Sequence, residues 1–192
     1  PPPESWQFVR AACDKHGALL VLDEIPTCLG RSEKMFVCEH DGSVPDILVI
    51  GKGLGGGVVP LAAVIARGDL ALAPEGALGH YTHEKNPVAC AAGLATIKVI
   101  EEEGLLGHVD ELGRECLEML NCLQENHPDL IAEVRGIGLL LGLILTRPDG
   151  SKAVDAAEEV MYRAMERGLS FKLTMGNILT LTPPLTITRA EM

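Results

Sequence analysis

The chain has 192 residues, of which 47% are hydrophobic and only 3% aromatic, and its formal net charge is −11. This length allows one large domain or one and a half ordinary ones, with a core of aliphatic side chains. The acidic balance and the lack of a basic run argue against nucleic acid and against an anionic membrane surface as partners.

No apolar stretch approaches the roughly 20 residues that are needed to cross a bilayer. The start of the chain, Pro-Pro-Pro-Glu, does not look like a signal peptide. The six cysteines show no CxxC pair and no spacing typical of a disulfide framework, which favours free thiols in a reducing cytoplasm. Cys38 and His40 could ligate a metal, but two ligands without two more do not indicate a metal site.

The first half of the chain alternates helical and strand-like patterns, as expected of an α/β domain. Apolar side chains recur at helical spacing or gather in short continuous runs of strand length. In chain order these patterns predict a helix at 6–15, strands at 18–22, 47–50 and 61–66, and a helix from Asn86-Pro87 to residue 103. We expect residues 1–98 to be part of a large domain whose mainly parallel sheet is flanked by helices.

Two of these strands run into residues of opposite charge. The strand at 18–22 leads into Asp23, and the strand at 47–50 leads through Gly51 into Lys52 and a glycine-rich loop. The carboxyl ends of parallel strands lie at the edge of an open α/β sheet where ligands bind. Each residue alone is a common feature of strand ends and loops, but the pair indicates a site. The loop is not a P-loop, because its lysine precedes the glycines.

The pattern changes in the second half, where amphipathic helices are mixed with strands of antiparallel character. In chain order it predicts a helix at 105–124, a turn at 134–138, a strand at 139–145, a helix at 154–167 and an alternating strand at 178–181. We therefore expect residues 99–192 to form a smaller α+β C-terminal domain.

Several motifs occur together along the whole chain. They are Leu-Asp-Glu-Ile-Pro-Thr-Cys-Leu-Gly-Arg at 22–31, Pro-Asp-Ile at 45–47, Lys-Gly-Leu-Gly-Gly-Gly at 52–57, Thr82 with Asn-Pro-Val-Ala-Cys-Ala-Ala at 86–92, Arg-Gly-Ile-Gly at 135–138 and Pro-Pro-Leu-Thr at 183–186. In order and approximate spacing, the set resembles the class III pyridoxal-phosphate-dependent aminotransferases, which have the aspartate aminotransferase fold. Chains of that family are much longer. The resemblance therefore implies a fragment, inactive alone, with part of the cofactor-binding large domain and a truncated small domain.

The resemblance also implies roles for individual residues. Lys52 would form a Schiff base with pyridoxal phosphate and then move the substrate proton, which requires an unprotonated amine. Asp23 would pair with the protonated pyridine nitrogen and keep the ring an electron sink. Ile25 would pack against the ring, although plain core packing explains it nearly as well. Thr82 would hydrogen-bond the cofactor phosphate, usually across the subunit interface. The implied reaction is transamination between an amino acid or amine and a keto acid, in a homodimer with shared active sites.

Three positions depart from the family's pattern. Pro26 stands where the family usually has a glutamine that hydrogen-bonds the cofactor's ring oxygen, and proline cannot donate such a bond. Cys28 replaces a usual glycine. Thr180 stands where many members have an arginine that clamps a substrate carboxylate in bidentate fashion. Either another residue binds the carboxylate, with Lys172 as a candidate, or the substrate lacks a carboxylate there.

These departures leave two alternatives open. One alternative is an amino-acid racemase or epimerase of the same family, which needs no keto-acid co-substrate. The missing arginine at position 180 favours this alternative without deciding it. The other alternative is a non-catalytic interaction module, since the chain lacks the family's earlier phosphate-binding loop and ring-stacking aromatic residue.

Overall fold

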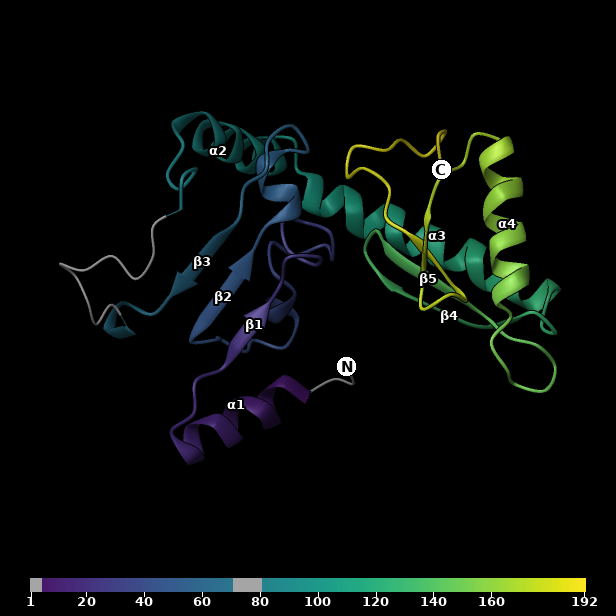
Figure 1. Cartoon of the computed structure of the whole chain (residues 1–192), viewed down its shortest axis with the longest axis horizontal. Helices are drawn as coiled ribbons and strands as arrows, with labels where there is room; N and C mark the ends of the chain where they lie inside the picture. Colours follow the sequence, from purple (N-terminus) through teal and green to yellow (C-terminus); the bar gives the residue numbers. More distant parts are fainter. Residues whose placement is uncertain (1–4, 71–80) are drawn as a thin grey trace. The chain divides into compact units, whose positions relative to one another are not determined.

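The computed structural model describes residues 5–70 and 81–192, which belong to two compact units (Figure 1). The first unit comprises Pro1–Gly30 and Lys34–Leu106, and the second comprises Arg31–Glu33 and Gly107–Met192. The domain boundary expected after residue 98 lies inside helix α2 (Pro87–Glu102), whereas the compact units change over after Leu106. Within the described ranges, no helix has the length and apolarity that crossing a bilayer requires.

The first unit is built on a three-stranded sheet of order β1-β2-β3. Its elements are α1 (Ser5–His16), β1 (Val21–Asp23), η1 (Val37–His40), β2 (Ile47–Ile50), η2 (Lys52–Gly55), β3 (Ala63–Ala66), η3 (Gly68–Leu70) and α2. Strands β1 and β2 are parallel as predicted, but β3 runs antiparallel to β2, so the described sheet is mixed rather than mainly parallel. The connection between β2 and β3 contains only the short η2 turn. Gly56 and Gly57, both with left-handed backbone, reverse the chain before a crossover helix could form.

Helix α2 begins where its sequence predicts and covers the loop that contains Lys52. The side chain of Asn86 accepts hydrogen bonds from the backbone N–H groups of Val88 and Ala89, and Pro87 is the first helical residue. A Cβ atom added at Gly93 would lie 2.6 Å from Leu61 Cδ2 and 3.3 Å from the carbonyl oxygen of Leu54. The small residues of α2 therefore let it approach η2 closely.

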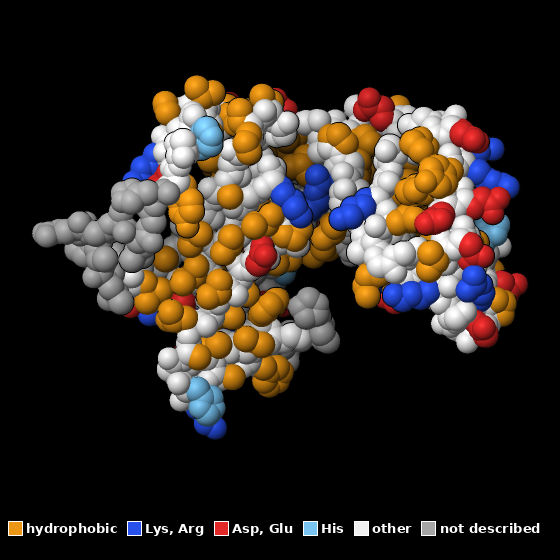
Figure 2. All heavy atoms as spheres, in the orientation of Figure 1, with side chains coloured by type: hydrophobic (Ala, Val, Ile, Leu, Met, Phe, Trp, Pro, Cys, Tyr) orange, Lys and Arg blue, Asp and Glu red, His pale blue; other side chains and the backbone are white. Residues whose placement is uncertain are grey.

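Apolar side chains of the first unit also lie on its surface. Figure 2 shows hydrophobic side chains gathered over the part of the chain that carries β1 to β3. Val21 on β1 and Val64 and Ile65 on β3 are 53%, 67% and 48% exposed. The inward-facing residues of the described sheet are thus covered by helices and loops of the same unit, whereas Val21, Val64 and Ile65 are exposed to solvent.

The second unit is a four-stranded antiparallel sheet of order β4-β5-β7-β6. Its elements are α3 (Leu105–Asn126), of which Leu105 and Leu106 belong to the first unit, β4 (Ile131–Ile137), β5 (Leu140–Leu145), α4 (Val154–Glu166), β6 (Lys172–Thr174) and β7 (Ile178–Leu181). Buried leucines from one sheet face form the core with α3 and α4. They include Leu141, Leu143, Leu145 and Leu179.

The prediction of a turn at 134–138 is wrong for four of these five residues. Residues 134–137 lie in β4, and Gly138, with φ of 52°, forms the reversal into β5 together with Leu139. The two glycines suggested a turn, but Gly136 pairs with Leu141 inside the hairpin. No sequence pattern predicted strand β6. It is three residues long, and within the described ranges its only neighbouring strand is β7.

Candidate active site

Lys52 follows β2 directly after Gly51 and begins the short η2 turn. Its side chain is exposed, and its backbone has a φ of 47°, in the left-handed region that few residues other than glycine adopt. Such a conformation costs an L-residue about 1 kcal/mol or more and is found preferentially at functional sites. The turn therefore places Lys52 directly at the end of the strand.

Asp23 lies at the same edge of the sheet as Lys52. It is the last residue of β1 and pairs in parallel register with Val49, while the N–H of Glu24 donates to the Val49 carbonyl over 2.9 Å. The Oδ1 atom of Asp23 accepts a hydrogen bond from the backbone N–H of Ile25 at 3.1 Å. Among the described residues, the other carboxylate oxygen has no hydrogen-bond partner. Asp23 and Lys52 thus follow neighbouring parallel strands at the same edge of the sheet.

Ile25 completes this group from the loop after β1. A Cβ atom added at Gly51 would lie 3.5 Å from Ile25 Cγ1, so the isoleucine packs over the residue just before Lys52. Thr82 lies in the exposed turn that precedes α2. In the part of the chain that is described, it makes no hydrogen bond to Asp23, Ile25 or Lys52. The structure brings three of the four predicted residues to one edge, and the roles of all four stay predictions.

Glu24 is a residue of this edge for which sequence reasoning found no role. It is only 1% exposed, and its carboxylate accepts hydrogen bonds from the backbone N–H groups of Val37 at 2.6 Å and Cys38 at 2.9 Å. The hydroxyl of Thr27 donates a third at 3.3 Å. The carboxylate thus ties the loop after β1 back onto η1. The alternation of side chains along a strand, which turns Asp23 outward and Glu24 inward, was the available signal.

Two buried thiols flank this edge. Burial raises the pKa of Cys28, although the backbone N–H of Gly51 and the charge of Lys52 act in the opposite direction. Burial and the neighbouring Glu24 raise the pKa of Cys38 to about 11. Both thiols are therefore protonated at neutral pH and are poor nucleophiles.

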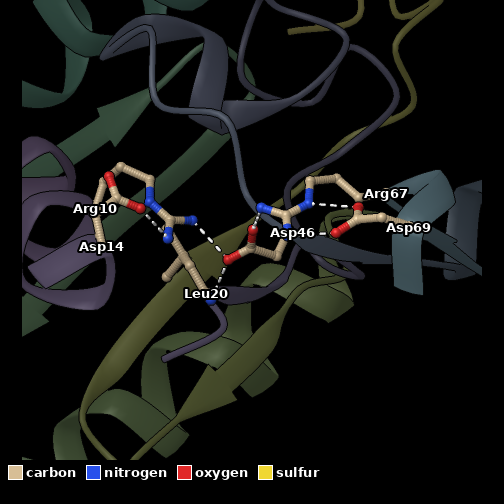
Figure 3. A network of polar contacts seen from close by, with 6 residues as sticks. All are labelled: Arg10, Asp14, Leu20, Asp46, Arg67 and Asp69. Atoms are coloured by element: carbon tan, nitrogen blue, oxygen red, sulfur yellow. Dashed lines mark hydrogen bonds and ion pairs between the residues drawn. The ribbon is translucent and has the colours of Figure 1, made fainter. Parts of the chain in front are cut away.

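The start of β2 is anchored by a buried carboxylate, Asp46, which is 3% exposed (Figure 3). It accepts hydrogen bonds from the backbone N–H of Leu20 at 2.7 Å, from Arg10 at 2.7 Å and from Arg67 at 2.5 Å. The Leu20 N–H and then the Arg10 guanidinium hold the pKa of Asp46 below its usual value. Each arginine also pairs with a second, exposed aspartate. This network joins α1, the approach to β1, and the ends of β2 and β3, and so fixes the strands that carry Asp23 and Lys52.

The second unit holds the position where the family often has an arginine. Thr180 lies on β7 opposite Lys172 on β6, so the two side chains share one face of the sheet. The hydroxyls of Thr180 and Thr174 are hydrogen-bonded at 2.8 Å. Arg31, which sequence reasoning left without a role, donates to the carbonyl oxygens of Leu139 at 3.0 Å and Pro183 at 2.5 Å. Burial lowers the pKa of this guanidinium.

Comparison with known proteins agrees with this arrangement. A family model described as Aminotransferase class-III matches residues 1–192. The chain is 45% identical over its whole length to (R)-1-hydroxy-2-aminoethylphosphonate ammonia-lyase of Vibrio splendidus, of which it covers 40%. It is also 41% identical over its whole length to leucine/methionine racemase of Thermococcus litoralis, of which it covers 43%.

Solved structures give the same result. The acetylornithine aminotransferase from Elizabethkingia anophelis matches all of this chain with a TM-score of 0.90 and 34% identity, and the match covers 49% of that protein. The expected α/β fold class is thereby confirmed. The chain belongs to the class III aminotransferase family, whose members are pyridoxal-phosphate-dependent, and it spans half or less of the length of these relatives.

Proposed function

We propose that this chain carries the cofactor-holding lysine of a pyridoxal-phosphate-dependent enzyme that transfers an amino group between an amino acid or amine and a keto acid. The observation that carries the proposal is the placement of Lys52 and Asp23 at the ends of adjacent parallel strands. When bound, pyridoxal phosphate supplies an electron sink for the substrate carbon next to the amine. The whole protein, rather than this stretch alone, is the unit to which the activity is assigned.

The residues present fit that cofactor in three respects. Lys52 offers an exposed amine that is free of any ion pair within the described residues. The unpartnered oxygen of Asp23 can accept a hydrogen bond from a protonated ring nitrogen, since Ile25 N–H occupies only the other oxygen. The side chain of Ile25 supplies an apolar surface beside Gly51. Pro26 supplies no donor for the ring oxygen.

Within this reaction the residues would have distinct tasks. Lys52 would hold the cofactor and then carry the proton to and from the substrate carbon, for which its place at the end of the strand is suited. Asp23 would keep the ring nitrogen protonated through charge and hydrogen bonding. The network around Asp46 holds the starts of β1 and β2 together.

The test uses the full-length protein. We expect it to turn yellow with pyridoxal phosphate, and borohydride to fix the cofactor covalently on the peptide that contains Lys52. Lys52→Gln should abolish both the fixation and the activity, whereas Lys34→Gln, which removes an exposed lysine outside the site, should change neither. A protein that stays colourless with the cofactor, or a label on another lysine, would contradict the proposal.

A second candidate reaction needs no keto acid. One relative is named a racemase and another an ammonia-lyase, and Thr180 cannot provide a bidentate clamp for a substrate carboxylate. Incubation of single enantiomers without keto acid separates the cases. Loss of optical activity supports a racemase or epimerase, sustained release of ammonia supports a lyase, and arrest after one half-reaction supports the transferase.

We further propose a cytoplasmic homodimer whose active sites are shared between subunits. The six cysteines, all free, suit a reducing compartment, and an exposed Thr82 is available to a partner subunit. Mass measurement in solution and cell fractionation test the two parts of this proposal separately.

A further inference from the structure

A row of four residues crosses the whole sheet of the second unit. Arg135 on β4 pairs with Gly142 on β5, Gly142 pairs with Thr180 on β7, and Thr180 pairs with Lys172 on β6. Residues directly opposite one another in antiparallel strands point to the same face. We call this set the cross-strand row. Its two cations are separated by the width of three strand spacings, roughly 14 Å.

The row lies on the sheet face that is opposite to the core. The neighbouring residues along the strands, Leu143 on β5, Leu179 on β7 and Leu173 on β6, pack in the core beneath α4. Because side chains alternate along a strand, the members of the row point the other way. Arg135 and Lys172 are exposed, and Thr180 is half-buried.

The centre of the row is open. A Cβ atom added at Gly142 would meet only atoms of the sheet itself, namely Ile178 Cγ2 at 3.6 Å, the Arg135 carbonyl oxygen at 3.9 Å and the Leu179 carbonyl oxygen at 4.0 Å. No atom from another layer of the described chain lies within 4 Å of that point. A ligand group can therefore rest on the glycine between two long cationic side chains.

Hydrogen-bond donors flank this point on both sides of the same sheet face. Lys172 has no ion-pair partner within residues 5–70 and 81–192, and the only carboxylate near Arg135 is the exposed Glu133, at 3.7 Å. In the pair of Thr180 and Thr174, one hydroxyl donates to the other, which leaves one hydroxyl proton available to a ligand. The row thus offers an ammonium on β6, a guanidinium on β4 and a hydroxyl from the threonine pair between them.

We propose that the cross-strand row binds a tetrahedral oxyanion, such as a phosphonate, phosphate ester or sulfonate. Such a group carries three acceptor oxygens in different directions, which matches three separate donors. A carboxylate has two coplanar oxygens and is matched best by both N–H groups of one guanidinium fork, whereas the single guanidinium of this row, Arg135, stands at its outer end on β4. Lysine binds phosphate-like groups as a point charge. The carrier of this group is either the amine substrate, a link that rests on the proposed function, or a free anion.

The first experiment does not depend on the cofactor. Binding of methylphosphonate to the full-length protein is followed by phosphorus NMR, with acetate as the competing carboxylate. We expect Lys172→Gln to weaken methylphosphonate binding roughly 10- to 100-fold, the range for loss of a charged hydrogen-bond partner. Lys98→Gln, which removes an exposed lysine from α2 and has the same effect on net charge, should leave binding unchanged. Equal binding by wild type and Lys172→Gln, no binding by either, or stronger binding of acetate overturns the proposal.

The second experiment identifies the carrier. Aminoethylphosphonate, taurine and β-alanine have the same two-carbon spacing between amine and anion and are compared as amino donors of the loaded enzyme. If the substrate carries the group, Lys172→Gln raises KM for the first two and changes kcat little, and Thr180→Arg shifts preference toward β-alanine. If none of the three reacts while methylphosphonate still binds at the row, the source is a free anion, and the test of Lys52 decides the proposed function independently.

Discussion

At the scale of single residues, two adjacent carboxylates have opposite roles because they point in opposite directions. Asp23 is exposed and keeps one oxygen free, while Glu24 is almost completely buried and accepts two backbone N–H groups. A buried charge is tolerated when hydrogen bonds compensate its lost hydration. Glu24 is therefore a structural residue, and Asp23 remains available for a ligand.

Substitution of these neighbours should separate stability from cofactor binding. Glu24→Gln replaces one accepting oxygen by an NH₂ group that faces backbone donors, and we expect a loss of about 1–3 kcal/mol in the free energy of unfolding. Asp23→Asn should change that free energy by less than about 0.5 kcal/mol, since it is exposed, but should weaken cofactor retention. Urea unfolding and cofactor absorbance measure the two effects. A stability loss in Asp23→Asn as large as that in Glu24→Gln would show that both carboxylates are structural.

At the scale of elements, the strands of the first unit depend on one charged centre. The pKa of Asp46 is lowered in the folded chain, first by the Leu20 N–H and then by Arg10. Its stabilising effect is therefore fully present above the pKa of the unfolded chain and is lost as the pH falls through the lower folded value.

We expect the acid limb of the stability profile to reflect this group. As the pH falls below about 4, stability of the wild type should decline as Asp46 becomes protonated. Asp46→Asn should be less stable at neutral pH and should lose less stability on acidification. Thermal unfolding across this range measures both, with Asp129→Asn at an exposed position as the control. Parallel acid limbs for wild type and Asp46→Asn would argue against Asp46 as the titrating group.

The second unit depends on close contact between α3 and the turn after β4. A Cβ atom added at Gly113 would lie 2.5 Å from the Gly138 carbonyl oxygen, whereas Gly107, on the same helix, has no atom within 4 Å. Gly113→Ala should therefore destabilise the protein by about 1–3 kcal/mol through overpacking. Gly107→Ala should stabilise it by about 0.5–1 kcal/mol through helix propensity. Urea midpoints that move in the same direction for both variants would contradict this contrast.

At the scale of the whole molecule, the proposed dimer with shared sites makes a quantitative prediction. If one site combines Lys52 from one subunit with Thr82 from the other, a hybrid of Lys52→Gln and Thr82→Ala subunits contains one site with both residues intact. Random re-association of equal amounts should then restore roughly a quarter of wild-type activity, because half of the dimers are hybrids with one good site of two. Activity that stays at the average of the two separate variants would place Thr82 in the same subunit's site or outside it.

The sequence predicted those features that depend on local pattern. The bounds of β2 follow from its apolar run, and the start of α2 follows from Asn86-Pro87. Asp23 and Lys52 were found because they come at or just after the ends of the apolar runs of β1 and β2. The antiparallel direction of β3 depends on glycine conformations, and the partners of Glu24 depend on long-range hydrogen bonds. Neither has a signature of fixed spacing, although side-chain alternation could have shown that Glu24 points inward. The pairing of Lys172 with Thr180 was equally hidden, because register between two strands arises only on folding.

At Lys52 the left-handed backbone favours glycine for stability, whereas the proposed function requires the lysine amine. Glycine would adopt that conformation without strain, so a search for heat-resistant variants would favour Lys52→Gly, which discards the amine. Consensus or library approaches to stabilising this protein should therefore hold position 52 fixed. Improvements are better sought at sites such as Gly107, where the added methyl group meets open space.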